Sequence, residues 1–298
     1  MKAQHPPSIE HDLLICSTML SPDEKLHSWI EYHLRRADII LIFMDDPIQR
    51  PFFEPYTENE RVLLLDGPTD RSDMTPSGIM NRIMANTQDA ISYALQNGIS
   101  WVLPVDSDEI FYDEGDRSWQ SWEDVGHVTF VNHEAVPLKQ EPANCFVECT
   151  LFRINSRTQF MAYGNGKSAV RVTPELKSGI HNFRNHSGEH RSVKSPCILH
   201  YPNPSFESWV AKFGNYSIFS DFWWNLPNVP IELKFMLRSR DLLQEARNTS
   251  QWGKARDFFA SWVLDTETRD DLLQKGLLRH YDPMAELLTG PPQPVADR

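Results

Sequence analysis

Long apolar runs, basic charge and paired cysteines are all scarce in this sequence of 298 residues. The longest uninterrupted apolar run covers residues 39–44, whereas a membrane-spanning helix needs about 20 apolar residues. The first 12 residues contain no apolar segment of the kind that a secretory signal carries. We therefore expect a protein that has no transmembrane segment and resides in the cytoplasm.

The balance of charge excludes two classes of partner. The chain carries 29 Lys and Arg residues against 41 Asp and Glu residues, which gives a formal net charge of −12 at pH 7. Sequence-independent binding to nucleic acid or to an anionic membrane requires a basic surface. We expect no nucleic-acid partner, and the acidic balance suits a protein that attracts divalent cations.

The four cysteines, Cys16, Cys145, Cys149 and Cys197, form no CxxC motif. Cys145 and Cys149 lie four residues apart, but no second pair of ligands with zinc-finger spacing accompanies them. We expect reduced, buried thiols. The sequence contains 40% hydrophobic and 23% charged residues, which is ordinary for a globular protein and excludes a disordered chain.

Strand-like and helix-like segments alternate in the first third of the chain. Apolar runs predict strands at residues 13–16, 39–44, 62–65 and 101–105. Helical periodicity follows Ser21-Pro22, and a second helix is predicted between Thr75-Pro76 and Asn97-Gly98. The pattern predicts an α/β fold with a mostly parallel sheet flanked by helices, in which ligands bind beyond the carboxyl ends of the strands.

The later part of the chain has a different character. Short strands are predicted at residues 128–131, 146–152 and 197–199, and a helix at residues 205–219. Amphipathic helices follow, so we predict one domain over residues 1–224 and a helical C-terminal extension over residues 225–298, packed on the first.

The motif WVLPVDSDEIF, residues 101–111, joins a buried strand to an acidic cluster. In an extended backbone alternate side chains share a face, so Asp106 and Asp108 are expected to point the same way. Two carboxylates that close repel unless a cation lies between them. Hard oxygen ligands of this kind suit Mn²⁺ or Mg²⁺ bound to a diphosphate. A solvated acidic loop is the alternative.

Residues 24–111 resemble the nucleotide-sugar-binding half of GT-A glycosyltransferases, and family 92 and family-2-like proteins most of all. The resemblance is carried by Glu24, Trp29, His33, the D-S-D-E of residues 106–109, Lys167 to Arg171, His181, His200-Tyr201, Ser205, Glu207 and Lys212. It implies a GT-A, Rossmann-like fold and an inverting hexosyltransferase that takes a UDP-sugar donor and a glycan or other hydroxyl acceptor. It also implies that His181 completes the metal shell, with His200 as the alternative.

Several other residues are candidates for binding the donor. Carboxylates and hydroxyls at strand ends accept hydrogen bonds from a nucleoside, and cations pair with a diphosphate. The candidates are Ser17, Asp46, Asp66, Arg82, Lys167 and Arg171. Turn aspartates and ordinary surface cations are the alternatives, and His33 is expected to be satisfied internally.

An inverting reaction needs a carboxylate that accepts the proton of the acceptor hydroxyl. Glu134, Glu148 and Asp221 are candidates, and we favour Glu134 because it follows a strand beyond the acidic motif. The sequence thus predicts a metal-dependent glycosyltransferase in which Asp106 and Asp108 hold the metal. A Mg²⁺-dependent phosphohydrolase or nucleotidyltransferase, and a non-catalytic carbohydrate-binding protein, are the alternatives.

Overall fold

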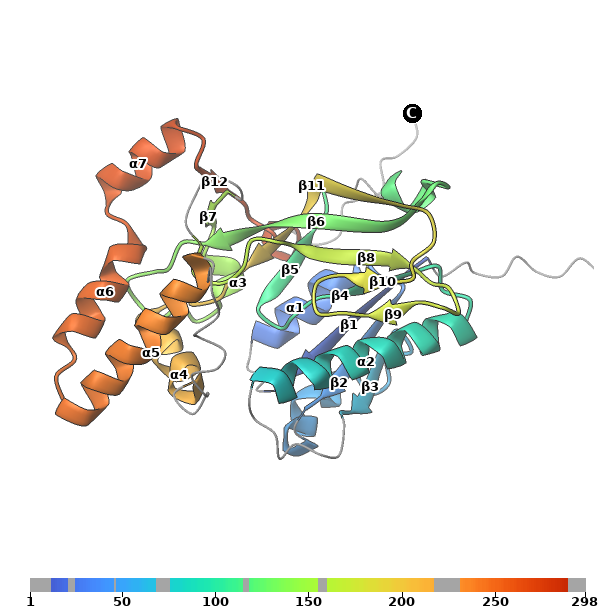
Figure 1. Ribbon diagram of the computed structural model, residues 1–298, viewed down its shortest axis with the longest axis horizontal. Coiled ribbons are helices and arrows are strands. Elements are labelled where there is room, and N and C mark those ends of the chain that lie inside the picture. Colours follow the sequence, from blue (N-terminus) through green and yellow to red (C-terminus); the bar gives the residue numbers. More distant parts are fainter. Residues whose placement is uncertain are drawn as a thin grey trace, which may run out of the picture.

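The computed structural model describes residues 12–20, 25–45, 47–67, 76–114, 118–154, 160–216 and 231–288. A large sheet lies against helices on one side of the molecule, and a group of helices projects at the other side (Figure 1). The sheet has ten strands, and its longest path of hydrogen-bonded neighbours follows the order β12-β7-β6-β8-β4-β1-β2-β3.

The parallel half of this sheet comes from the first third of the chain. Its elements are β1 (Leu13–Met19), α1 (Lys25–Leu34), β2 (Ile39–Met44), β3 (Val62–Asp66), α2 (Pro76–Gln96) and β4 (Trp101–Pro104). The strands β4, β1, β2 and β3 lie side by side and all run in one direction. Their carboxyl ends therefore meet at one edge, as the α/β pattern predicts.

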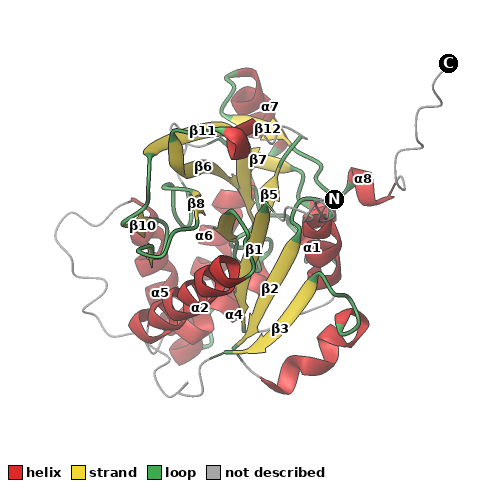
Figure 2. Cartoon of the chain, turned by 90° about the vertical axis from the view of Figure 1, so that its right-hand side faces the viewer, coloured by secondary structure: helices red, strands yellow, loops and turns green. Residues whose placement is uncertain are grey.

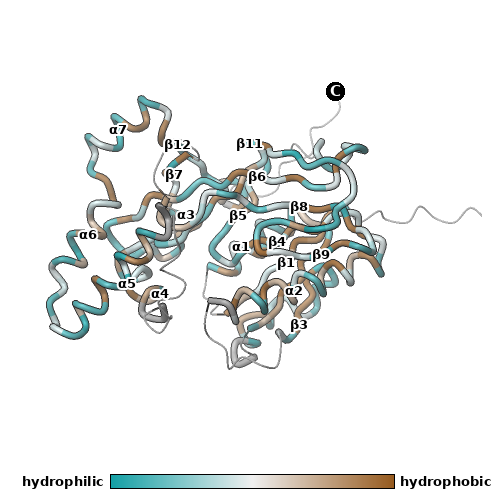
Figure 3. Tube along the Cα trace, in the orientation of Figure 1, coloured by the Kyte–Doolittle hydropathy of each residue, from teal (hydrophilic) through white to brown (hydrophobic). Residues whose placement is uncertain are grey.

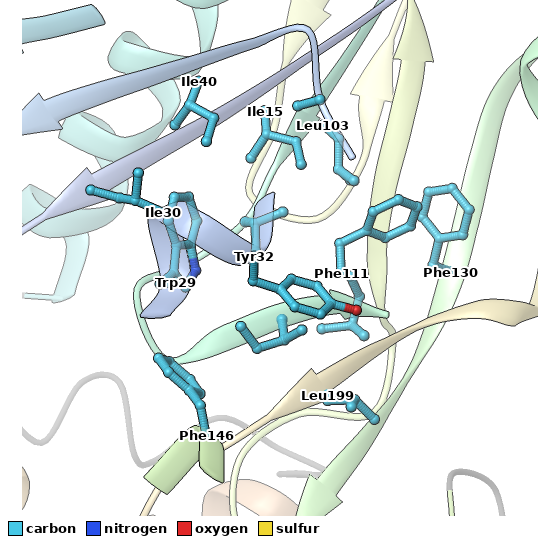
Figure 4. Close-up of a cluster of buried hydrophobic side chains, with 14 of the residues drawn as sticks. Ile15, Trp29, Ile30, Tyr32, Ile40, Leu103, Phe111, Phe130, Phe146 and Leu199 are labelled. Carbon is cyan, nitrogen blue, oxygen red and sulfur yellow. The ribbon is translucent and has the colours of Figure 1, made fainter. Parts of the chain in front are cut away.

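Both faces of the parallel half are covered, which explains the uninterrupted apolar runs. Successive residues of β1, such as Leu14 and Ile15, belong to different apolar clusters. The cluster with Ile15 contains Trp29 and Ile30 of α1, and the cluster with Leu14 contains residues of α2. The two helices lie on opposite sides of these strands (Figure 2). Figure 4 shows the Trp29 and Ile30 side chains of α1 beside Ile15 and Ile40.

The other half of the sheet is largely antiparallel. Its strands are β5 (Glu109–Tyr112), β6 (Val125–Ala135), β7 (Leu151–Arg153), β8 (Lys167–Arg171), β11 (Glu189–His200) and β12 (Leu278–His280). β8 joins the two halves because it pairs with β4 and with β6, antiparallel to both. β5 pairs with the end of β11. A small hairpin of β9 (Lys177–Ser178) and β10 (Phe183–Arg184) forms a separate sheet.

The C-terminal region is helical. It consists of α4 (Phe206–Tyr216), α5 (Ile231–Thr249), α6 (Gly253–Val263), α7 (Thr266–Gln274) and α8 (Ala285–Leu288). Trp209, Phe213, Phe235 and Phe259 bury one side of α4, α5 and α6 in a common apolar cluster. Along α5 to α7 the colours in Figure 3 alternate between hydrophilic and hydrophobic, which is typical of helices that bury one side. Between α7 and α8 the chain returns as β12 to the sheet.

The α/β class and the helical C-terminal region are confirmed, with parallel strands at the core of a mixed sheet. The predicted domain boundary near residue 224 lies outside the described residues and stays a prediction. All four cysteines are buried and free, as expected. Among the helices of the described ranges, none combines the length and apolar content needed to cross a membrane.

The predicted strand at residues 146–152 is wrong in its first half. Residues Cys145–Glu148 form the short helix α3, and only Leu151–Arg153 form a strand, β7. Asn144 caps the helix, because its side-chain oxygen accepts a hydrogen bond of 3.0 Å from the backbone N–H of Phe146. The short helices η1 (Pro47–Tyr56) and η2 (Ser118–Ser121) complete the structure.

Candidate functional site

The acidic cluster forms a tight turn between two strands. β4 ends at Pro104 and β5 begins at Glu109, and the backbone N–H of Glu109 donates to the carbonyl of Asp106 over 3.0 Å. The expected extended backbone from Asp106 to Asp108 is therefore wrong, because β5 leaves to pair with β11. We call residues 106–109 the acidic turn. It lies at the carboxyl end of the parallel half of the sheet.

Trp29 on α1 donates hydrogen bonds to the backbone of the acidic turn. Its indole Nε1 donates to the carbonyl oxygens of Asp106, at 3.2 Å, and Glu109, at 2.7 Å. His33, one helical turn further on, accepts a hydrogen bond of 3.1 Å at Nε2 from the N–H of Phe111. Burial lowers the pKa of His33 to about 3, so its imidazole is neutral and structural, as expected.

Lys167 reaches the acidic turn from the neighbouring strand β8. Its ammonium lies 2.6 Å from an oxygen of Asp106 and 3.5 Å from one of Glu109, and its side chain is 3% exposed. Burial disfavours the ammonium charge, but the nearby carboxylates outweigh it and raise the pKa of Lys167. Lys167, which the sequence suggested as a cation for a diphosphate, is therefore buried against two carboxylates of the acidic turn.

Glu109 is the most enclosed acid of the turn. It is fully buried, accepts a hydrogen bond of 2.8 Å from the N–H of Asp106, and also accepts one from the hydroxyl of Tyr163. Burial raises the pKa of Glu109 to about 7, although the ammonium of Lys167 opposes the rise. A buried carboxyl with a pKa near neutrality changes its charge easily when a cation enters or leaves.

Asp108 faces a second pair of cationic groups. One of its oxygens lies 3.2 Å from the ammonium of Lys212 on α4 and 3.6 Å from Nε2 of His200 on β11. Burial opposes ionisation, but Lys212 and His200 together hold the pKa of Asp108 well below its usual range. The pKa of His200 is raised in turn, because the Asp108 carboxylate outweighs the effect of burial.

Glu134 lies behind His200, on the side away from Asp108. Its oxygens accept hydrogen bonds from the backbone N–H groups of Met161, at 2.6 Å, and Ala162, at 2.8 Å. One oxygen lies 3.7 Å from Nδ1 of His200. Glu134 is fully buried, and burial raises its pKa to about 6.

The other two carboxylates considered as a general base lie elsewhere. Glu148, in α3, accepts a hydrogen bond of 3.0 Å from the N–H of Asn144. Asp221 lies outside the described residues.

Tyr163 connects the two histidines considered as metal ligands. Its ring lies 4.6 Å from that of His181 and 4.9 Å from that of His200, measured between centroids. Burial, assisted by Lys167, lowers the pKa of His181 to about 4, so its imidazole is neutral. Within the described parts of the chain, no three His, Cys, Asp or Glu side chains are grouped as a ready-made metal site.

Other predicted donor-binding residues that the structure describes come from β1, β3 and α2. Ser17 is buried on β1, and among the described residues its hydroxyl has no hydrogen-bond partner. Asp66 is exposed and pairs with Arg50 at 2.9 Å. Arg82 on α2 is held by Asp45, which follows β2. Asp46 lies outside the described residues.

Arg171 is not brought to the acidic turn. It pairs in register with Trp101 at the start of β4, and Asp106 follows the end of that strand. Its guanidinium donates to the carbonyl of Trp122 over 2.9 Å and lies above the Trp101 ring at 4.6 Å. These contacts tie β8 to the segment before β6.

The contributions of Glu109 and Tyr163 to this site were missed from sequence. Glu109 stands inside the D-S-D-E motif, so its position was a usable signal. Tyr163 precedes Gly164-Asn165-Gly166, and Asn132 orders this loop by accepting the N–H of Gly166 over 3.1 Å. That long-range contact leaves no local pattern in the sequence.

Two curated relatives place the chain near one class of protein. A glycosyltransferase-like protein of Arabidopsis thaliana is 24% identical over 231 residues, which cover 67% of this chain and 44% of the relative. A second glycosyltransferase-like protein of the same plant is 25% identical over 156 residues, 43% of this chain and 35% of the relative. The chain thus spans less than half the length of these relatives. It is distantly similar to glycosyltransferase-like proteins, and no family model matches it.

Solved structures give weaker likenesses. A mannose-1-phosphate geranyltransferase of Thermus thermophilus shares 12% identity and covers 77% of this chain and 68% of its own, with a TM-score of 0.27. A variant of the UDP-glucose pyrophosphorylase of Leishmania major shares 7% identity and covers 63% of this chain and 64% of its own, with a TM-score of 0.29.

Proposed function

We propose that this protein is a metal-dependent glycosyltransferase of the hexosyltransferase type. The acidic turn carries the proposal, because Asp106 and Asp108 leave 38% and 31% of their side chains exposed beyond the carboxyl end of the parallel strands. Ligands of open α/β sheets bind at this edge. The similarity to glycosyltransferase-like proteins supports sugar transfer in general terms.

The charges around the acidic turn fit a divalent cation. The ammonium groups of Lys167 and Lys212 face three carboxyl groups, those of Asp106, Glu109 and Asp108. Mg²⁺ and, in the same kind of site, Mn²⁺ are typically held by one or two carboxylates, with waters and substrate phosphates completing the shell. Asp106 and Asp108 would hold the ion, with His181, or alternatively His200, as a third ligand. When bound, the ion supplies positive charge to a diphosphate leaving group.

The protein's own residues have distinct roles in this proposal. The hydroxyl of Ser17, buried within β1 and with no partner among the described residues, would bind a nucleoside only after becoming accessible, and a UDP-sugar is the expected donor. Lys167 keeps the acidic turn charged and compact from within. An acceptor hydroxyl of a glycan or similar molecule would attack the anomeric carbon, with inversion, and displace the nucleoside diphosphate.

The general base of this reaction is a separate question. Glu134 is enclosed, and both of its oxygens accept hydrogen bonds from backbone N–H groups. This arrangement supports a positioning role for Glu134, whose carboxylate faces Nδ1 of His200 at 3.7 Å, beyond hydrogen-bond distance. Direct contact between Glu134 and an acceptor hydroxyl would require this buried carboxylate to become accessible.

Binding and transfer assays test the proposal together. UDP with Mn²⁺ is expected to raise the melting temperature, since a ligand at about a hundred times its Kd stabilises a protein by about 2.7 kcal/mol. Asp108→Ala is expected to reduce metal-dependent sugar transfer by roughly 10²- to 10³-fold, the loss typical of one electrostatic stabiliser. Asp271→Ala, which removes an exposed carboxylate of α7 paired with Lys275, is the matched control.

The products of the same assay distinguish the other classes. A phosphohydrolase releases phosphate or a sugar phosphate from a UDP-sugar, whereas a transferase releases UDP. A non-catalytic carbohydrate-binding protein binds sugar equally well with and without EDTA. Full transfer activity in Asp108→Ala contradicts the proposed role of the acidic turn.

A further inference from the structure

Lys212 reaches the acidic turn from outside the sheet. Its ammonium lies 3.2 Å from the Asp108 carboxylate and donates to the carbonyl of Pro202 over 3.1 Å. α4, which carries it, is anchored by Trp209 and Phe213 in the apolar cluster of the C-terminal helices. The helical region therefore supplies one cation to a site that the sheet otherwise builds.

The two lysines of the site differ in access to solvent. The Lys167 side chain is 3% exposed and lies between Asp106 and Glu109, whereas that of Lys212 is 31% exposed. Lys212 and Asp108 each leave 31% of their side chains exposed, and we call this solvent-accessible side of the acidic turn its open side, from which a phosphate group would approach. Lysine has a flexible four-carbon stem, so its ammonium can shift while its helix stays in place.

A divalent cation on Asp108 changes the balance of forces on Lys212. The Asp108 carboxylate would then be neutralised by the metal, and the metal repels an ammonium a few ångströms away. A diphosphate bound to the same metal brings new negative charge to the open side of the turn. Lysine is a common phosphate ligand and acts there as a point charge.

We infer that Lys212 binds the phosphate oxygens of the nucleoside diphosphate when a divalent cation occupies Asp108. The same ammonium occupies Asp108 when the metal is absent. This inference rests on the proposed function and adds a specific phosphate ligand to it. Lys212 thus competes with the metal for Asp108 and cooperates with it at the diphosphate.

The two roles predict opposite effects of one substitution, which calorimetry can measure. In Lys212→Gln, UDP at saturating Mn²⁺ is expected to bind roughly 10- to 100-fold more weakly, the size of one hydrogen bond to a charged group. Uridine, which has no phosphate, is expected to bind as in the wild type. Mn²⁺ alone is expected to bind as tightly or more tightly, because a competing cation is gone. Lys212→Arg is expected to restore most of the UDP affinity.

Lys254→Gln is the matched control, because Lys254 is an exposed lysine that pairs with Glu245, also in the helical region. Unchanged UDP affinity in Lys212→Gln overturns the inference. A parallel loss of UDP, uridine and Mn²⁺ binding also overturns it, since that pattern indicates a purely structural role. Failure of the wild type to bind UDP with Mn²⁺ is a different result, which refutes the proposed function before any variant is compared.

Discussion

The guanidinium of Arg82 donates two hydrogen bonds, of 2.9 and 3.0 Å, to the carboxylate of Asp45. The two side chains are 6% and 5% exposed, so the pair is removed from water. It ties α2 to the residue that follows β2, at the edge of the sheet where the proposed donor binds. Arg82, which the sequence suggested as a phosphate ligand, therefore forms a buried ion pair with Asp45.

Breaking this pair is expected to be costly. Arg82→Ala leaves the Asp45 carboxylate buried without its partner, and such changes destabilise a protein by about 3–5 kcal/mol. Arg50→Ala breaks the exposed pair with Asp66 and is expected to cost less than about 1 kcal/mol. Urea unfolding of both variants measures the difference, and equal losses would contradict the role given to burial.

Glu134→Gln separates a positioning carboxylate from a direct base. A glutamine keeps one acceptor oxygen, so one of the backbone N–H groups of Met161 and Ala162 loses its partner. We expect a loss of about 1–3 kcal/mol of stability, measured by urea unfolding, with Glu148→Gln as an exposed control. Unchanged stability with abolished transfer would show that Glu134 acts on the acceptor itself.

Trp29→Phe tests whether the indole holds the acidic turn in shape. The substitution removes the donor to the carbonyls of Asp106 and Glu109, so Mn²⁺ affinity is expected to fall by roughly tenfold, as for other residues that orient metal ligands. Trp119→Phe is the matched control. Trp119 is equally buried, and its Nε1 has no hydrogen-bond partner among the described residues.

Both tryptophan variants lose packing, but only Trp29→Phe loses the two hydrogen bonds. Calorimetry with Mn²⁺ and urea unfolding therefore separate metal affinity from stability. An equal fall in Mn²⁺ affinity in the two variants would assign the effect to packing alone.

His127, which packs against two other histidines, is expected to make stability depend on pH. His127 on β6 stacks on His190 at 4.2 Å between ring centroids and lies 4.8 Å from His186. Burial, followed by the effects of His190 and His186, lowers the pKa of His127 to about 4. In the unfolded chain this imidazole binds a proton below a pH of about 6.5.

Protons therefore favour the unfolded state as the pH falls from about 6.5 to about 4, and up to about 3 kcal/mol of stability is lost over this range. His127→Phe is expected to make the decline shallower. Part of the decline is expected to remain, because burial also lowers the pKa values of His33 and His133. Unfolding free energies at several pH values measure the slope.

The parallel half of the fold could be predicted from sequence because it is covered on both faces. The predicted run at residues 39–44 coincides with β2, and the helix predicted between Pro76 and Asn97 agrees with α2 to within one residue. Segments with local signals of this kind need no knowledge of their neighbours. The strand predicted at residues 146–152 failed because the local cap at Asn144 outweighs β-propensity there.

The candidate site was predictable in its residue types and less so in its geometry. The D-S-D-E motif identified the acidic turn, but the departure of β5 toward β11 depends on a partner about 90 residues away in the sequence. The pairing of Asp108 with Lys212 and the stacking of His127 on His190 likewise join distant segments. Contacts of this kind are set by tertiary packing and leave no periodic pattern.

The strand β12 has a consequence for how the molecule is made. It covers β7 at the edge of the sheet, yet it comes after all of the helices from α4 to α7 in the chain. On the ribosome, more than a hundred residues must follow β7 before β12 is available, whereas its other neighbour, β6, precedes it in the chain. During that interval the backbone groups on this side of β7 are unpaired, and an unpaired strand edge can pair with another chain.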